Sequence, residues 1–270
     1  VYGQRYDAAG DAVGSEFQIN TYITTNQISS SVASLVDGGF VVTWSSNGQD
    51  GSSYGIYGQR YDVASNPVGD EFQVNSFTSS TQSASSVASL ADGGFVVTWE
   101  SNNQDGSNYG VYGQRYDAAG IVVGGEFQIN TYTTSSQHDA SIASLADGGF
   151  VVIWKSYGQD GDSYGIYGQR YDASANVIGG EFQINTYTTK SQHNASVSAL
   201  ADGGFVVVWN YNNGTRNGVY GQQYDASGNT VGSEFHANTY TYESLTQYSY
   251  DPSVTSLADG GYVITWNVHG

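Results

Sequence analysis

A short polar loop that recurs along the chain carries the residue types best suited to bind a ligand. In its first copy Gln49 and Asp50 are followed by Ser52 and Tyr54. An aromatic ring beside carboxylate, amide and hydroxyl groups offers the apolar face and the hydrogen-bond partners that a sugar requires. The candidate ligand-binding residues are Gln49, Asp50, Ser52, Tyr54, Gln104, Asp105, Ser107, Tyr109, Gln159, Asp160, Ser163 and Tyr164.

The same loops supply oxygen atoms for a hard cation, so calcium is a candidate cofactor. Ca²⁺ takes roughly six to eight oxygen ligands. The loops lack the alternating carboxylates of an EF-hand, and an Asp-Gly turn with solvated neighbours explains them equally well. The candidate metal ligands are Asp50, Asp105, Asp160 and Asp162.

Catalytic chemistry has weaker support in the sequence. The chain has no Cys, no nucleophile elbow and no phosphate-binding loop. His138 and His193 occupy equivalent positions in two repeats, but metal binding would need further ligands nearby, so we interpret them as surface polar residues. One acid pair unique to a single repeat, Glu243 and Asp251, lies in the last long loop. We therefore predict no catalytic residues, with a polysaccharide-cleaving enzyme as the alternative.

The loops are positioned by a unit that is repeated five times. Its most regular stretch is Asp-Gly-Gly-Phe-Val-Val-Thr-Trp at 37–44, and the second signature is Tyr-Gly-Gln-Arg-Tyr-Asp at 57–62. The period is about 55 residues, which is typical of stacked or ring-shaped repeat folds. The five tryptophans mark the repeats: Trp44, Trp99, Trp154, Trp209 and Trp266.

Hydrophobic residues alternate with a period of two, which indicates strands. The first full repeat predicts strands at 31–35, 40–44, 56–61 and 71–75. Four antiparallel strands form one blade of a β-propeller. Strand 40–44 is apolar on both faces, so its Trp44 is expected to pack between blades. Arg60 and Glu71 on adjacent strands are expected to form an ion pair or a hydrogen-bonded network.

The two ends of the chain complement each other. It begins with a lone third-and-fourth-strand hairpin, 2–20, and ends with a lone first-and-second-strand hairpin, 253–266. Pairing them completes a fifth blade and removes open sheet edges. We predict an all-β fold, a single five-bladed β-propeller over 1–270 closed by this pairing. A segment of a longer solenoid is the alternative.

Composition limits the partners and the compartment. The net charge is −18, which disfavours nucleic acid and anionic membranes. No apolar run reaches the roughly 18 residues of a membrane span. The absence of Cys and Met favours a secreted or bacterial cell-surface protein, and a start at Val1 in mid-repeat predicts a mature fragment or an excised segment.

The repeat resembles units of about 55 residues in large secreted bacterial proteins that often carry RTX-type calcium-binding repeats. The stretches that carry the resemblance are Asp-Gly-Gly-Phe-Val-Val-Thr-Trp, Gln-Asp-Gly-Ser, Tyr-Gly-Gln-Arg-Tyr-Asp and Glu-Phe-Gln-Ile-Asn, although the RTX nonapeptide itself is absent. The architecture is similar to five-bladed lectins of the tachylectin-2 type, which carry one sugar site per blade.

We predict a secreted, non-enzymatic, lectin-like adhesin that binds glycans or extracellular polysaccharide at several loops. Avidity across weak sites would explain the near-identical copies. A structural spacer module with self-association is a second alternative.

Overall fold

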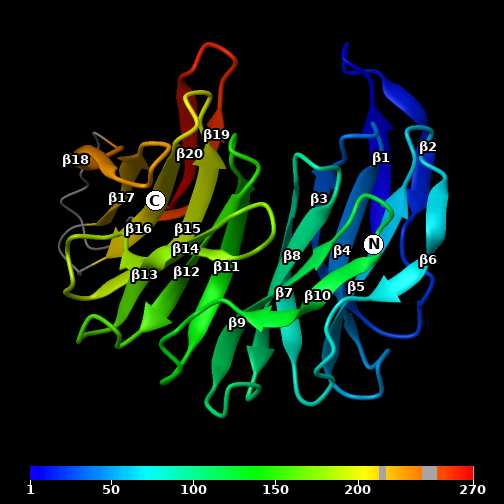
Figure 1. The fold of residues 1–270 in the computed structure, drawn as a ribbon, viewed down its shortest axis with the longest axis horizontal. Helices are drawn as coiled ribbons and strands as arrows, with labels where there is room; N and C mark the ends of the chain where they lie inside the picture. The colour runs from blue at the N-terminus through cyan, green and yellow to red at the C-terminus, as the bar shows by residue number, and fades with distance from the viewer. Residues whose placement is uncertain (213–216, 239–247, 270) are drawn as a thin grey trace. The chain divides into compact units, whose positions relative to one another are not determined.

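The structure is a computed structural model that describes residues 1–212, 217–238 and 248–269 (Figure 1). The described chain forms strands and turns without a helix, and hence contains no helix that could cross a membrane. Four sheets have four antiparallel strands each, joined in chain order. The four-stranded repeat predicted from the hydrophobic pattern is therefore confirmed.

The strands of the four complete sheets have closely similar bounds. They are β3 (Gln27–Ser34), β4 (Phe40–Asn47), β5 (Tyr54–Tyr61) and β6 (Pro67–Gln73); β7 (Gln82–Ser89), β8 (Phe95–Asn102), β9 (Tyr109–Tyr116) and β10 (Val122–Gln128); β11 (Gln137–Ser144), β12 (Phe150–Tyr157), β13 (Tyr164–Tyr171) and β14 (Val177–Gln183); β15 (Ser191–Ala199), β16 (Phe205–Asn212), β17 (Asn217–Tyr224) and β18 (Thr230–His236). The first strand of each sheet begins earlier than predicted because it continues through a bulge.

Two further hairpins lie at the ends of the chain: β1 (Tyr2–Tyr6) with β2 (Ala12–Gln18), and β19 (Tyr248–Ser256) with β20 (Tyr262–His269). Each is a separate two-stranded sheet in the described structure. The predicted fifth blade, and with it ring closure, is not confirmed.

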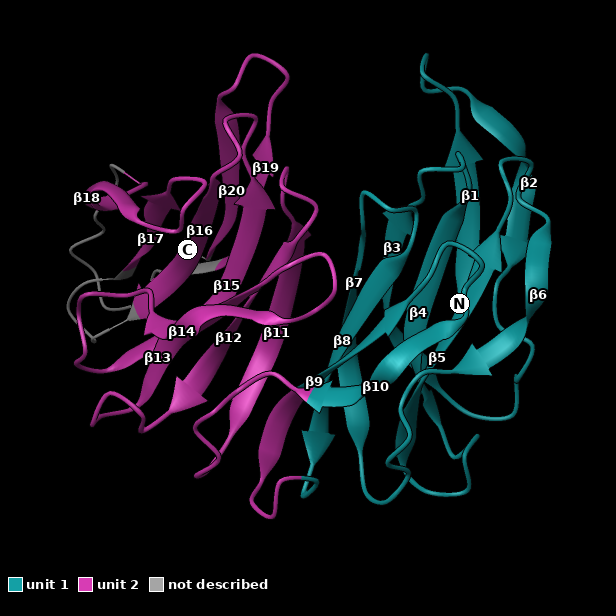
Figure 2. Ribbon diagram, viewed as in Figure 1, with its two compact units in different colours: residues 1–104, 112–127 teal, residues 105–111, 128–270 magenta. Residues whose placement is uncertain are grey.

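The chain divides into two compact units (Figure 2). One comprises residues 1–104 and 112–127, and the other residues 105–111 and 128–270. The first holds the sheet β3–β6 and the hairpin β1–β2, and the second holds the sheets β11–β14 and β15–β18 and the hairpin β19–β20.

The second strand of each sheet forms the core. Within the second unit, Val151 and Ile153 of β12 pack in one cluster with Val207 and Trp209 of β16, and all four are 0 or 1% exposed. In the first unit Trp99 of β8 likewise packs against Val41 of the preceding sheet. The tryptophans therefore fill space between sheets, as predicted.

The Asp-Gly-Gly turn has a local steric cause. Asp37 Oδ1 accepts a hydrogen bond of 2.9 Å from the backbone N–H of Gly39. Gly38 has φ +85°, a conformation that favours glycine. A Cβ on Gly39 would lie 2.2 Å from the carbonyl oxygen of Tyr61, so the turn requires two glycines for two different reasons.

The predicted ion pair between Arg60 and Glu71 was wrong. Arg60 lies directly across from Val41, close to the turn, and its guanidinium pairs with Asp37 at 3.5 Å. The same arrangement joins Arg170 to Asp147 at 3.6 Å. The strand register thus brings Arg60, Arg115 and Arg170 to a turn carboxylate instead of the glutamate.

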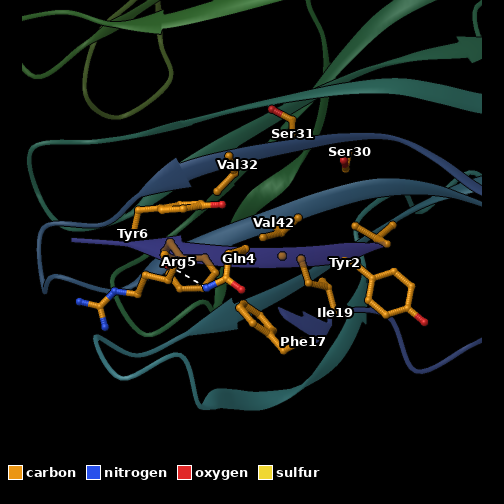
Figure 3. Close-up of a pocket in the computed structure, with 13 residues that line it drawn as sticks. Tyr2, Gln4, Arg5, Tyr6, Phe17, Ile19, Ser30, Ser31, Val32 and Val42 are labelled. Carbon is orange, nitrogen blue, oxygen red and sulfur yellow. Dashed lines mark hydrogen bonds between the residues drawn. The ribbon is translucent and has the colours of Figure 1, made fainter. Parts of the chain in front are cut away.

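The first unit contains an apolar cavity of about 370 Å³ between β1 and strands β3 and β4 (Figure 3). Tyr2 and Tyr6 of β1 line it and are 64% and 61% exposed. Their counterparts in the complete sheet, Tyr57 and Tyr61, are 6% and 4% exposed. The edge of β1 therefore lacks the cover that a neighbouring strand gives in every complete sheet.

We predict that Gly149→Ala destabilises the protein by about 1 to 3 kcal/mol, because the added Cβ would lie 2.2 Å from the carbonyl oxygen of Tyr171. Gly180→Ala is the matched control: no atom lies within 4 Å of its added Cβ, so its free energy of unfolding should change by less than about 0.5 kcal/mol. Urea unfolding of both variants measures the difference, and equal effects would contradict the steric explanation.

Candidate active site

The predicted ligand-binding loops are tied down by hydrogen bonds within each unit. Gln49 Nε2 donates to Glu71 Oε1 at 2.5 Å, and Asp50 Oδ1 accepts from the backbone N–H of Ser52 at 3.0 Å. Ser52 Oγ donates to the carbonyl oxygen of Ser80 at 3.3 Å. The polar groups of this loop thus hold it against its neighbours, and the role of its residues in ligand binding stays a prediction.

The repeat glutamates connect successive repeats. Glu71 Oε2 accepts a 2.7 Å hydrogen bond from the backbone N–H of Thr21, which belongs to the preceding repeat. Glu181 accepts equivalent bonds from Thr131, at 2.6 Å from its N–H, and from Gln159. These carboxylates therefore connect successive repeats by hydrogen bonds.

The third copy of the loop differs in charge. Asp162 Oδ2 accepts a bond of 2.9 Å from the backbone N–H of Lys190. Desolvation by burial raises the pKa of the Asp160 carboxyl, and the nearby Asp162 carboxylate raises it further. Among the described residues no three His, Asp or Glu side chains lie close enough together to hold a metal ion. Calcium binding at Asp50, Asp105, Asp160 and Asp162 stays a prediction.

A different group of residues meets at the first strands of the second unit. Each first strand has a bulge at the same point, marked by a non-glycine residue with positive φ, such as Asp139 at 54°, Asn194 at 54° and Asp251 at 50°. Bulges and strained backbone are concentrated next to functional sites because they redirect side chains. We call the following residues the bulge cluster: His138, Asp139, Lys155, His193, Asn194 and Asp251.

The bulge cluster is where the repeats differ most in chemistry. The positions equivalent to Asp139 hold Ser29 and Ala84 in the first unit, but Asn194 and Asp251 in the second. The residue paired across from His138 is Lys155, and its counterparts are Ser45, Glu100 and Asn210 in the other complete sheets. The repeated backbone is thus kept while these side chains vary in size and charge.

Two polar contacts organise the bulge cluster. Lys155 Nζ forms an ion pair of 2.6 Å with Asp139 Oδ2, and Asn194 Nδ2 donates to Asp251 Oδ1 at 2.5 Å. The Lys155 ammonium also lies 5.0 Å from the centre of the Tyr164 ring, within range of a cation–π interaction. One carboxylate is therefore ion-paired, whereas the exposed Asp251 accepts a bond from a neutral amide.

Half-buried His193 lies among these charges. Its pKa is lowered, first by desolvation and then by the Lys155 ammonium, against the opposing effect of the carboxylates of Asp139 and Asp251. His193 precedes Asn194 on β15, and β15 packs against both β11, which carries Asp139, and β19, which carries Asp251. His138 adds an aromatic wall, with its ring centre 4.7 Å from that of Tyr109 and 6.4 Å from that of Tyr164.

The arrangement of the bulge cluster suits acid–base chemistry. It supplies two carboxyl groups in different environments, one ion-paired and one exposed, and a pair of carboxyl groups is the residue type that glycoside hydrolysis uses. Sequence reasoning named Asp251 in the enzyme alternative, together with Glu243, which lies outside the described residues. It missed Asp139 and Lys155 and dismissed His138 and His193. Aligning the five repeats and marking non-repeated charges would have found them.

Comparisons with solved structures support the fold. The chain is similar to a thermostable family-43 glycoside hydrolase, at 12% identity and a TM-score of 0.51 over 94% of this chain and 87% of that one. It is similar to an α-L-arabinanase of Penicillium chrysogenum solved with arabinobiose, at 14% identity and a TM-score of 0.55 over 92% and 79% of the two chains. The polysaccharide lyase Uly1 has 10% identity and a TM-score of 0.52 over 98% of this chain and 61% of its own.

At these identities the comparisons establish a β-propeller-like, repeated all-β fold. No family model matches the sequence. No curated protein matches it either.

The prediction of a non-enzymatic, lectin-like adhesin was wrong. The similar structures are glycoside hydrolases and a polysaccharide lyase, which favour the enzyme alternative. The error came from giving most weight to what the five repeats share. Shared residues such as Gln49 and Glu71 hold the loops together, whereas the charged groups at the bulges occur in one or two repeats.

We predict that stability falls as the pH drops through about 6.5, the ordinary pKa of histidine, in a manner that depends on His193. Because the folded-state pKa is lowered, the unfolded chain binds more protons just below that pH, and protonation then favours unfolding. The free energy of unfolding of the unaltered protein should therefore decline more steeply than that of His193→Gln between pH 7 and about 5. Parallel pH profiles would contradict this prediction.

Proposed function

We propose that this protein is a polysaccharide-cleaving enzyme, a glycoside hydrolase that uses Asp139 and Asp251 as its pair of carboxylates. The observation that carries the proposal is that two carboxylates which the first two full repeats lack lie at the bulges of β11 and β19, two first strands that both pack against β15, where Asp139 pairs with Lys155 and Asp251 bonds to Asn194. Five equivalent sites would not need different charged residues from several repeats to lie together. A single reaction centre does, because groups with different roles act on one glycosidic bond.

The contacts suggest which carboxylate does what. Hydrolysis requires one carboxylic acid to protonate the leaving oxygen and one carboxylate to activate water or to attack the anomeric carbon. Protonating Asp139 would break its ion pair with Lys155, so Asp251 is the better proton donor and Asp139 the base or nucleophile. The C–O bond breaks, the leaving oxygen takes the proton, and water adds to the anomeric carbon.

Charge and the similar structures indicate a class of substrate. With a net charge of −18 the protein would repel a polyanionic polymer, so we propose a neutral polysaccharide. Arabinan is the first to test, because one similar structure is an arabinanase solved with arabinobiose. Since such polymers lie outside cells, the secreted location expected from the sequence is part of this proposal.

A lyase that acts on a uronate-containing polymer is the second candidate: His193 favours it, whereas the net charge of −18 favours the hydrolase. A lowered pKa leaves the imidazole neutral near pH 7, as a base that removes a carbon-bound proton must be. Lys155 would then offset the negative charge that develops on the substrate. An unsaturated product, detected by its ultraviolet absorbance, distinguishes elimination from hydrolysis.

The functional test is the release of reducing ends from arabinan by the unaltered protein and by Asp139→Asn and Asp251→Asn. Loss of either carboxyl should lower the rate by about 100-fold or more, because proton transfer and nucleophilic assistance contribute at least that much. Asp11→Asn, in an exposed turn of the first unit, should retain full activity. An unaltered protein that releases no product, or two variants that cleave normally, would overturn the proposal.

We also propose that the fold is a five-bladed propeller, in which a further pair of strands completes the sheet of β1 and β2. The exposure of Tyr2 and Tyr6 supports the presence of such a pair of strands. We assign β19 and β20 as that pair, because they correspond to the first and second strands of the repeat. Val263 of β20 is 42% exposed, whereas its counterpart Val41 is 0% exposed.

In the sheet β3–β6, Val41 pairs with Arg60. Arg5 of β1 is the counterpart of Arg60, and Val263 of β20 is the counterpart of Val41, so a completed fifth sheet would pair Arg5 with Val263. Arg5→Cys combined with Val263→Cys should therefore form a disulfide within one chain under mild oxidation, because the chain has no other cysteine to compete. Non-reducing electrophoresis with mass analysis would detect it. Cross-linked dimers alone, or free thiols, would contradict closure.

A further inference from the structure

The fourth complete sheet carries a group of aromatic side chains at one end. The ring centres of Tyr187 and Tyr211 lie 5.7 Å apart, and those of Tyr211 and Tyr220 lie 5.6 Å apart. His236 stacks on Tyr220 with ring centres 4.6 Å apart. We call these four residues, Tyr187, Tyr211, Tyr220 and His236, the aromatic patch.

Two of the four residues of the aromatic patch, Tyr211 and His236, differ in type from their counterparts in the other repeats. Tyr211 replaces a serine, and His236 replaces the glutamine that ends the fourth strand elsewhere. Tyr187 is 50% exposed, whereas the residues at its equivalent positions are half-buried. The replaced serines are Ser46, Ser101 and Ser156, the glutamines are Gln18, Gln73, Gln128 and Gln183, and the half-buried equivalents of Tyr187 are Tyr22, Phe77 and Tyr132.

A charge is also lost at this place. In the first full repeat the Asp50 carboxylate lies close enough to Tyr57 to help burial raise the pKa of that phenol to about 12. The fourth repeat has no Asp in the corresponding loop, 210–218. Next to Tyr220, the counterpart of Tyr57, the chain thus carries further aromatic rings where other repeats carry a carboxylate.

Such a surface suits the apolar face of a sugar ring. Aromatic side chains cover apolar C–H groups while their polar edges reach hydroxyl groups, and exposed rings mark binding sites. Tyr187 and His236 are the exposed members of the aromatic patch, whereas Tyr211 is buried beneath them and Tyr220 is half-buried. The strand register pairs His193 with Asn210, Tyr211 with Gly218, and Tyr220 with His236. The aromatic patch and His193 of the bulge cluster therefore lie at the same end of one sheet.

We propose that the aromatic patch is a sugar-binding subsite that holds further residues of the neutral polysaccharide cleaved at the bulge cluster. The substrate is then a polymer that extends beyond the cleaved bond instead of a short oligosaccharide. This inference rests on the proposed function for its substrate, but binding at the aromatic patch is measured without catalysis.

The experiment is affinity electrophoresis in gels containing soluble arabinan, with every protein carrying Asp251→Asn so that the polymer stays intact. Tyr187→Ala and His236→Gln should each weaken binding by about tenfold, the effect expected for the loss of one ring stacked on a ligand. His236→Gln restores the residue of the other repeats. Tyr132→Ala and Gln183→Ala, the same positions one repeat earlier, are the controls and should bind normally.

The outcomes separate the two proposals. No retardation by arabinan, unchanged binding of Tyr187→Ala and His236→Gln, or equal weakening in the controls would overturn the subsite. Retardation that depends on the aromatic patch, in a protein whose unaltered form releases no product, would support the subsite and overturn the glycoside hydrolase. Thermal unfolding of each variant identifies any loss of binding that is caused by misfolding. His236→Gln is expected to fold normally, because glutamine occupies this position in four other repeats, so a loss of binding in this variant reports on the aromatic patch itself.

Discussion

The structure depends on one constraint, the burial of the second strand of each complete sheet on both of its faces. In β12 the side chains of Phe150 to Trp154 are all 0% exposed, so they require a neighbour on each side. An antiparallel sheet standing alone in water could not provide this, and stacking of successive repeats does. Because the packing fixes every sheet in the same way, the first strands present their bulges at equivalent positions.

In a repeated scaffold of this kind, a single functional site requires residues that differ between the repeats. The strands, turns and loop ties use the residues that recur, such as the glycines of the Asp-Gly-Gly turn and the glutamates that link successive repeats. The bulge cluster and the aromatic patch use residues that occur in one or two repeats. Both lie in the second unit, where the third and fourth complete sheets and the last hairpin depart from the pattern.

The sequence was sufficient to predict the strands, the four-stranded sheets and the buried tryptophans, because a period of two and a fixed repeat determine them. It failed for Arg60, whose partner Asp37 follows from strand register rather than from composition. It also failed for the site. Asp139 and Asp251 are more than a hundred residues apart in the sequence, and only the packing of first strands brings together the strands that carry them.

The most direct test of the account is a crystal structure of Asp251→Asn soaked with an arabinan oligosaccharide. The account predicts a glycosidic oxygen within hydrogen-bond distance of the side chain at 251 and the anomeric carbon facing Asp139, with adjacent sugar rings against Tyr187 and His236. Sugar bound only at the loops of Asp50, Asp105 and Asp160, with the bulge cluster empty, would contradict it.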